Sequence, residues 1–308
     1  MAYTGVRPRH FALVVLAATL WGSGGVVGKV LGDHSGLHAM SVAMWRMAVG
    51  GLVLLGFLAV RRALTLRPLT RPMWVRILLT GGFTAVFEAT YFSAINLSSV
   101  GLTTLIAIGS APVMVAAFDW FALRTRPPRL TVIALVIALT GMVLLLGGSL
   151  DVGRSGMWGA ALALVTGASF AGVSVVNRHQ IPGLPPVLLT GTAFTAGALM
   201  LVPFALIAGI GAPADATGWG LVLLLGVVIT AFAYIAYLSG LVTVPPFVAT
   251  IVTLLEPLIA AVLGAIVLSE RLGPLGIVGG IVLGAAVVML RPQRDTPAPV
   301  RQPPTIVD

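Results

Sequence analysis

Four ionisable residues, Arg46, Glu88, Asp119 and Glu256, lie within long apolar stretches of the sequence. A charged residue at the centre of a membrane helix costs about 2.5–3.5 kcal/mol on insertion scales, so each one needs a structural or functional reason. Arg46 and Glu88 lie at similar depths in successive stretches. Either they form a buried ion pair that fixes two helices, or Glu88 titrates and couples to the movement of a proton or a solute. The sequence leaves both interpretations open.

The other two acids differ in their surroundings. Asp119 lies near the end of its stretch, where its side chain can reach toward Arg124 or Arg126, and this favours a structural role. Glu256 directly precedes Pro257 near the middle of its stretch. This position favours a cavity-lining role over that of a structural acid bonded to neighbouring hydroxyl groups.

Pro112 and Pro257 occupy matched sites in two of the apolar stretches. Each lacks the backbone N–H that a helix uses and should leave a carbonyl free one turn earlier, near Ile108 and Thr253. Paired interruptions in corresponding membrane helices are the best sequence pointer to a transport site. We therefore expect a helix interruption at each proline.

Aromatic residues accompany these groups at helical spacing. Glu88 and Tyr91 share a helix face, and Tyr234 and Tyr237 occupy the equivalent positions of a later stretch. Tyrosine also anchors membrane interfaces, but these positions favour a shared cavity. Trp21 is either a packing residue or part of the wall of this cavity. The second interpretation rests on the glycine-rich segment that follows Trp21, which would let a helix or a solute approach closely. Such a cavity would suit amphipathic or aromatic solutes through stacking or cation–π contacts.

Composition defines the elements that must position these residues. The chain has 308 residues, of which 58% are hydrophobic and 9% charged, with a mean hydropathy of +1.07, so lipid must be its solvent. With about 20 apolar residues per crossing, the sequence predicts ten membrane spans. They cover residues 11–31, 39–60, 74–95, 100–122, 130–148, 157–177, 186–209, 218–240, 247–268 and 274–290.

Several alternatives can be excluded. The first apolar stretch is too long for a secretory signal and lacks a convincing cleavage site, so we expect an uncleaved span. The absence of cysteine excludes disulfides, thiolate metal sites and a cysteine nucleophile. No phosphate-binding loop or His-Glu-x-x-His motif is present, and no cofactor or metal is expected. Asp119 has no embedded aspartate partner for an aspartyl mechanism. We therefore do not expect an enzyme.

The arginines predict the orientation. Although the formal net charge is +9, the basic residues fall in loops and tails, which indicates membrane topology rather than a nucleic-acid partner. Placing both termini in the cytoplasm satisfies the positive-inside rule. The residues then inside are Arg7, Arg9, Arg61, Arg62, Arg67, Arg71, Arg76, Arg124, Arg126, Arg129, Arg178, Arg291, Arg294 and Arg301.

The chain also repeats itself at an interval of about 145–149 residues. An odd number of spans in each half inverts the second copy, an architecture of alternating-access carriers. We expect a cytoplasmic segment 1–9, a first five-helix repeat 10–149, a second repeat 150–290 and a disordered Pro-rich tail 291–308. The matched pairs are Trp21 and Phe170, Lys29 and Arg178, Tyr91 and Tyr237, and Pro112 and Pro257.

These segments resemble the drug/metabolite transporter superfamily, specifically its EamA-type ten-helix exporters. The likeness covers residues 10–290 and is most specific from Leu255-Glu-Pro-Leu258 through Leu268-Ser-Glu-Arg-Leu272. The first copy departs from the family pattern, because it has Arg124-Thr125-Arg126 where the pattern has a glutamate. The resemblance implies export or exchange of small metabolites, amino acids or drugs.

The sequence therefore predicts an all-α protein of the bacterial inner membrane, with ten transmembrane helices in two inverted five-helix repeats. The expected function is secondary transport, by export, of small metabolites, amino acids or amphipathic compounds, with proton coupling through the embedded acids left open. Lipid scrambling and a non-transport receptor or structural role are the alternatives. Partners are a small-molecule substrate and membrane lipid, and assembly as a homodimer is left open. The internal pseudo-symmetry argues against a channel formed by a symmetric oligomer.

Overall fold

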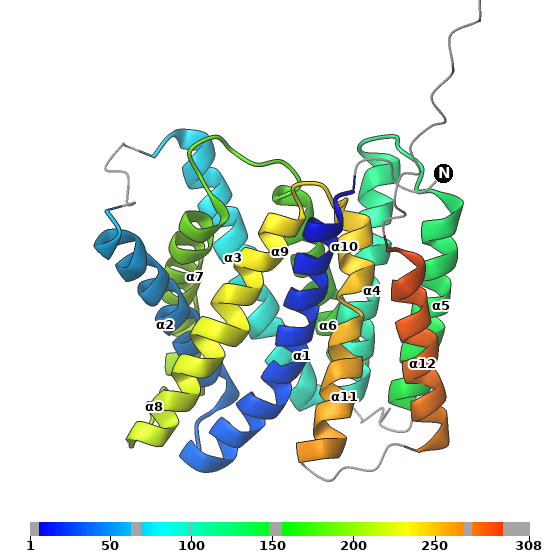
Figure 1. Cartoon of the computed structure of the whole chain (residues 1–308). Coiled ribbons are helices and arrows are strands. Elements are labelled where there is room, and N and C mark those ends of the chain that lie inside the picture. The colour runs from blue at the N-terminus through cyan, green and yellow to red at the C-terminus, as the bar shows by residue number, and fades with distance from the viewer. Residues whose placement is uncertain (1–5, 63–68, 99, 148–155, 268–272, 292–308) are drawn as a thin grey trace, which may run out of the picture.

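The computed structural model describes residues 6–62, 69–98, 100–147, 156–267 and 273–291 (Figure 1). These residues fold into helices, and no strand occurs among them. The helices are α1 (Pro8–Ser35), α2 (Ala39–Val60), α3 (Arg71–Leu97), α4 (Val100–Phe121), α5 (Arg129–Leu146), α6 (Gly156–Val176), α7 (Pro186–Ala208), α8 (Ala216–Leu223), the π-helix η2 (Leu224–Phe232), α9 (Ala233–Gly240), α10 (Pro246–Val252), α11 (Leu255–Val267) and α12 (Pro274–Met289).

The predicted spans are confirmed within a few residues at each end. In the described part of the chain, nine helical segments are long and apolar enough to cross a membrane, and α12 is a shorter apolar helix. Helices α8, η2 and α9 together form one of the nine, Ala216–Gly240, and α10 with α11 forms another, Pro246–Val267. The predicted repeat boundary at 149/150 and most of the predicted tail 291–308 lie outside the described residues.

The helix pairings follow the expected pseudo-symmetry. Helices α3 and α4 of the first half pack against α6 of the second half. The equivalent helices of the second half, α9 and α11, pack in the same way against α1 of the first half. The pairs α2 with α7 and α5 with α12 join equivalent helices of the two halves. Because each half has five spans, the second half is inverted relative to the first, and α1 begins at the same end of the bundle where α12 ends (Figure 1).

A polar contact at the opposite end joins α1 to the start of α8. The Asp215 carboxylate accepts a hydrogen bond from the Gly218 backbone N–H at 2.7 Å and pairs with His34 Nε2 at 2.8 Å. These interactions, the Gly218 N–H first and His34 second, lower the pKa of Asp215 below its usual value. Asp215 thereby caps α8 and ties the end of α1 to it.

Glycine allows two close helix crossings around the centre of the bundle. A Cβ at Gly50 of α2 would lie 2.6 Å from the Gly226 carbonyl oxygen of η2, and a Cβ at Gly226 would lie 2.7 Å from the Arg46 carbonyl oxygen. The crossing of α3 with α7 uses Gly81 and Gly197 in the same manner, since a Cβ at Gly197 would lie 2.8 Å from the Gly81 carbonyl oxygen. Small residues let membrane helices approach this closely.

Replacing Gly50 by alanine tests this packing. The added methyl group meets backbone that must move, so we expect the free energy of unfolding to fall by about 1–3 kcal/mol. Gly56→Ala in the same helix is the matched control, because a Cβ there meets nothing within 4 Å. It should be neutral or slightly stabilising, since alanine favours helix over glycine by about 1 kcal/mol. Thermal unfolding of the purified protein in detergent measures both, and equal stability of the two variants would contradict the close crossing.

Candidate functional site

A cavity of about 370 Å³ lies between the two halves. This size falls within the range of about 300–1,000 Å³ that is typical of small-molecule sites. Both halves contribute to its wall, and the described lining is mainly apolar and aromatic with three charged side chains. The central lining residues are Trp21, Gly24, Gly28, Val42, Arg46, Phe87, Glu88, Tyr91, Phe92, Ile108, Phe170, Leu225, Ile229, Thr230, Tyr234 and Glu256.

The cavity extends toward one end of the bundle. Its wall continues to Gly32, Leu37 and Ala39 around the α1–α2 connection, and to Ile95 and Val100 around the α3–α4 connection. This end is the lower one in Figure 1, opposite the start of α1. A solute can therefore approach the described cavity from that end.

Six of the residues singled out in the sequence line the cavity: Trp21, Arg46, Glu88, Tyr91, Tyr234 and Glu256. Phe170, the symmetry mate of Trp21, lines it as well. Tyr91 donates or accepts a hydrogen bond with Thr104 Oγ1 at 2.8 Å. The sequence therefore located the charged side chains and several of the aromatic side chains of the wall, which come from α1, α2, α3, α9 and α11.

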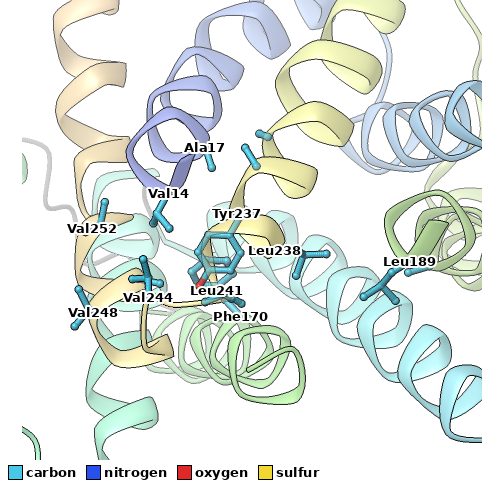
Figure 2. Close-up of a cluster of buried hydrophobic side chains, with 14 of the residues drawn as sticks. Val14, Ala17, Phe170, Leu189, Tyr237, Leu238, Leu241, Val244, Val248 and Val252 are labelled. Carbon is cyan, nitrogen blue, oxygen red and sulfur yellow. The ribbon is translucent and has the colours of Figure 1, made fainter. Parts of the chain in front are cut away.

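Tyr237 is not among the residues that line the described cavity, so the substrate contact expected there stays a prediction. Its side chain is fully buried, with the ring centroids of Trp21 and Phe170 5.3 and 5.7 Å away, and its hydroxyl group lies 2.7 Å from Ser174 Oγ. Figure 2 shows Tyr237 next to Phe170 in this buried cluster. Inverted symmetry gives the reason. Tyr91 faces the open end of the bundle, and its mate Tyr237 faces the closed end.

Arg46 and Glu88 form an ion pair that joins α2 to α3. The Glu88 side chain is 2% exposed, and Arg46 Nε has no hydrogen-bond partner in the described structure. The geometry is that of the buried ion pair that one of the two interpretations required. Because both side chains line the cavity, the pair also forms part of the surface that a solute would meet.

Glu256 follows a break in the ninth span. Helix α10 ends at Val252, and α11 begins at Leu255, so Glu256 lies in the first turn of α11. No hydrogen bond or ion pair to its carboxylate occurs within the described residues, although Arg46 is close enough for their charges to interact. A Cβ at Gly22 of α1 would lie 2.6 Å from the Glu256 carbonyl oxygen, so α1 and α11 are in direct backbone contact beside this residue.

The helix interruption expected at Pro112 is absent, because α4 runs unbroken from Val100 to Phe121. In the ninth span the break lies at Thr253 and Leu254, before Pro257, and the Thr253 carbonyl accepts a hydrogen bond from Glu256 N at 2.9 Å. A membrane helix tolerates a proline when its neighbours pack closely around it, and Pro112 is buried. Neither proline lines the cavity.

Aromatic rings form a continuous layer at the base of the cavity. Trp21 lies 5.0 Å from Tyr234 and 5.8 Å from Phe170 between ring centroids, and Phe170 lies 6.2 Å from Phe87. Phe87 stacks on Tyr91 at 5.8 Å with an interplanar angle of 8°. Sequence reasoning missed Phe87. Its spacing of four residues before Tyr91 was the available signal, since i and i+4 share a helix face.

Polar contacts close the other end of the bundle. Arg178 Nη2 donates to Asp119 Oδ1 at 2.5 Å and its guanidinium lies 5.6 Å from the centre of the Phe118 ring, which joins α4 to the end of α6. Asp119 thus has an ion-pair partner, but on another helix rather than at Arg124 or Arg126 as expected. Asn177 Nδ2 donates to Thr80 Oγ1 at 3.0 Å, which joins the end of α6 to α3.

Comparison with known proteins gives a consistent result. The model of the EamA-like transporter family matches twice, at residues 10–147 and 157–291. The uncharacterized transporter YwfM of Bacillus subtilis is 30% identical over 287 residues, covering 92% of this chain and 95% of that protein. The uncharacterized inner membrane transporter YicL of Salmonella typhimurium is 28% identical over 290 residues, covering 88% and 93%. A crystal structure with 17% identity has a TM-score of 0.76 over 91% of this chain and 96% of that chain, and shows the same fold.

The ion pair makes a prediction about stability. Glu88→Gln leaves the positive charge of the Arg46 guanidinium without a counter-charge. Arg46→Met leaves the negative charge of the Glu88 carboxylate without one. We expect each single change to lower the free energy of unfolding by about 3–5 kcal/mol. The double change Arg46→Met with Glu88→Gln should be less destabilising than the sum of the two single changes, because it removes both charges together. Denaturant unfolding in detergent measures this cycle, and additive effects would contradict a direct pair.

Proposed function

Because the chain belongs to the EamA-like transporter family, we propose that it is a secondary transporter that exports small amphipathic or aromatic solutes by alternating access. The chain is a multi-pass protein of the inner membrane. The observation that carries the proposal is the cavity between the two halves, whose described wall contains aromatic and charged side chains and extends toward the end of the bundle at the α1–α2 and α3–α4 connections.

The two repeats, 10–149 and 150–290, supply the moving parts in this proposal. Symmetry-related contacts differ between the two ends of the bundle. Asn177 bonds to Thr80 at the closed end, whereas their mates, Gly28 and Leu225, line the cavity at the open end. If the halves exchanged conformations, the open end would close around Gly28 and the closed end would open around Asn177. This exchange is what alternating access requires of an inverted repeat.

Proton coupling is the second part of the proposal. Glu88 and Glu256 are the two acids among the described lining residues, and a buried carboxylate must be paired or protonated. Glu88 is paired with Arg46, whereas Glu256 is free of any described hydrogen bond or ion pair. Glu256 is therefore the better candidate for a group that exchanges a proton during transport, in place of the role that the sequence left open for Glu88.

A flux screen tests the transport function. Purified protein in proteoliposomes should move at least one solute from a panel of amino acids, amines and dyes, and a pH gradient should accelerate it. Trp21→Ala should lower this flux about tenfold through lost ring contacts. Trp158→Ala is the matched control, since Trp158 is 68% exposed on the outside of the bundle, and it should keep the wild-type rate.

Two results would count against the function. Flux no greater than that of empty vesicles across the panel would shift attention to lipid scrambling or a receptor role. Equal loss of flux in Trp21→Ala and Trp158→Ala would indicate a general effect of tryptophan removal rather than a cavity contact.

The orientation needs its own test. We propose that both termini are cytoplasmic, which is supported by the arginines beside α3, α4 and α5 at the end where α1 begins. The described cavity would then face away from the cytoplasm. A fluorescent protein fused after the C-terminus should fluoresce, and an alkaline phosphatase fused there should be inactive. Both reporters should give the reverse result when fused after residue 273, and an active C-terminal phosphatase would overturn the orientation.

A further inference from the structure

The charged groups of the cavity are not balanced. Among the described lining side chains there are one guanidinium, Arg46, and two carboxylates, Glu88 and Glu256. Arg46 is in direct ion-pair contact with Glu88, so the charges of these two side chains compensate each other. The remaining carboxylate, Glu256, has no hydrogen bond or ion pair within the described residues. One negative charge is therefore left for a ligand or a proton to neutralise.

The surroundings of Glu256 favour an organic cation over a compact metal ion. Glu256 lines the same cavity as Tyr91 and Tyr234. These tyrosines come from opposite halves and belong to the ring layer that Trp21 and Phe170 complete. Aromatic faces attract organic ammonium groups and stack on apolar bodies, whereas no group of three or more His, Cys, Asp or Glu side chains that could hold a metal ion occurs among the described residues.

We propose that this cavity selects small organic monocations, with Glu256 as their counter-charge and the aromatic layer as the wall around the cationic group. The proposal deepens the transport function and rests on it, since it assigns the charge of the transported solute. It predicts that a cation binds better than a neutral, anionic or zwitterionic molecule of similar size. Glu88 has a different role, because its charge is already compensated by Arg46.

Binding to the purified full-length protein in detergent tests the assignment separately from flux. The labelled probe is benzyltrimethylammonium, whose charge is permanent, and the competitors are benzyl alcohol, phenylacetate and phenylalanine. Wild-type protein should bind the probe and release it to the unlabelled cation, with little competition from the other three. Glu256→Gln should weaken probe binding by about tenfold or more, as expected when a buried counter-charge is lost.

Two further variants guard against trivial explanations. Glu256→Asp keeps the charge and should retain most of the affinity, which separates loss of charge from loss of folding. Asp33→Asn removes one negative charge from an exposed position at the end of α1 and should leave binding unchanged. A Glu256→Gln protein that unfolds at the wild-type temperature but binds the cation weakly would support the proposal.

Other outcomes would overturn it. Tighter binding of phenylacetate or phenylalanine than of the cation, or an unchanged affinity in Glu256→Gln, would exclude Glu256 as the counter-charge. If the wild-type protein still moved solutes in proteoliposomes, these results would contradict only the assigned charge of the solute. If no solute moved, the transport function itself would fall.

Discussion

The ion pair between Arg46 and Glu88 depends on how closely four helices approach one another. Arg46 projects from the turn of α2 whose backbone touches Gly226 of η2, and Glu88 lies on α3, seven residues after the glycine at which α3 crosses α7. A buried ion pair is favourable only when its geometry is well fixed, because desolvation of both groups opposes it. The glycine crossings supply this geometry. The positions of the charges in the cavity therefore depend on the backbone packing. A larger residue at Gly50 or Gly226 should also displace the guanidinium of Arg46.

The two halves of the bundle are related by pseudo-symmetry, but several features of the cavity occur in only one half. Glu88 corresponds to Tyr234, and Glu256 corresponds to Ala111, so the two acids occupy non-equivalent positions. The break between α10 and α11 has no counterpart in the continuous α4, and η2 has none in α3. Gly226 follows its mate Gly81 by 145 residues, whereas Tyr237 follows Tyr91 by 146. The π-helix between Gly226 and Tyr237 accommodates this extra residue, because its hydrogen-bonded turn spans five residues instead of four.

The sequence was sufficient to predict the spans, the family and the charged residues of the cavity wall, because hydropathy and the repeat act over many residues. It was not sufficient where the outcome depended on which end of the molecule is open. Tyr91 and Tyr237 are equivalent in the repeat, yet only Tyr91 reaches the cavity. The partner of Asp119 was wrong for a related reason. Arg124 and Arg126 are close to Asp119 in the sequence, whereas Arg178 is brought close to Asp119 only by the packing of α4 against α6. Similarly, the pattern gave Pro112 and Pro257 the same weight, whereas helix continuity depends on local packing.

The polar contacts at the closed end give the two ends different stabilities. The symmetry mate of Asp119 is Gly264, so the open end has no carboxylate at the position where Asp119 meets Arg178. Asn177 and Thr80 likewise correspond to Gly28 and Leu225, which cannot form a side-chain hydrogen bond. Exchanging the conformations of the two halves would therefore break polar contacts at one end without creating equivalent ones at the other.

In a transport cycle, the described conformation would be favoured in the absence of a solute. A solute shifts such an equilibrium only by its differential affinity for the two states. Tyr237 and Ser174, buried here at the closed end, would become part of the wall in the other state, and contacts with them are one source of that difference.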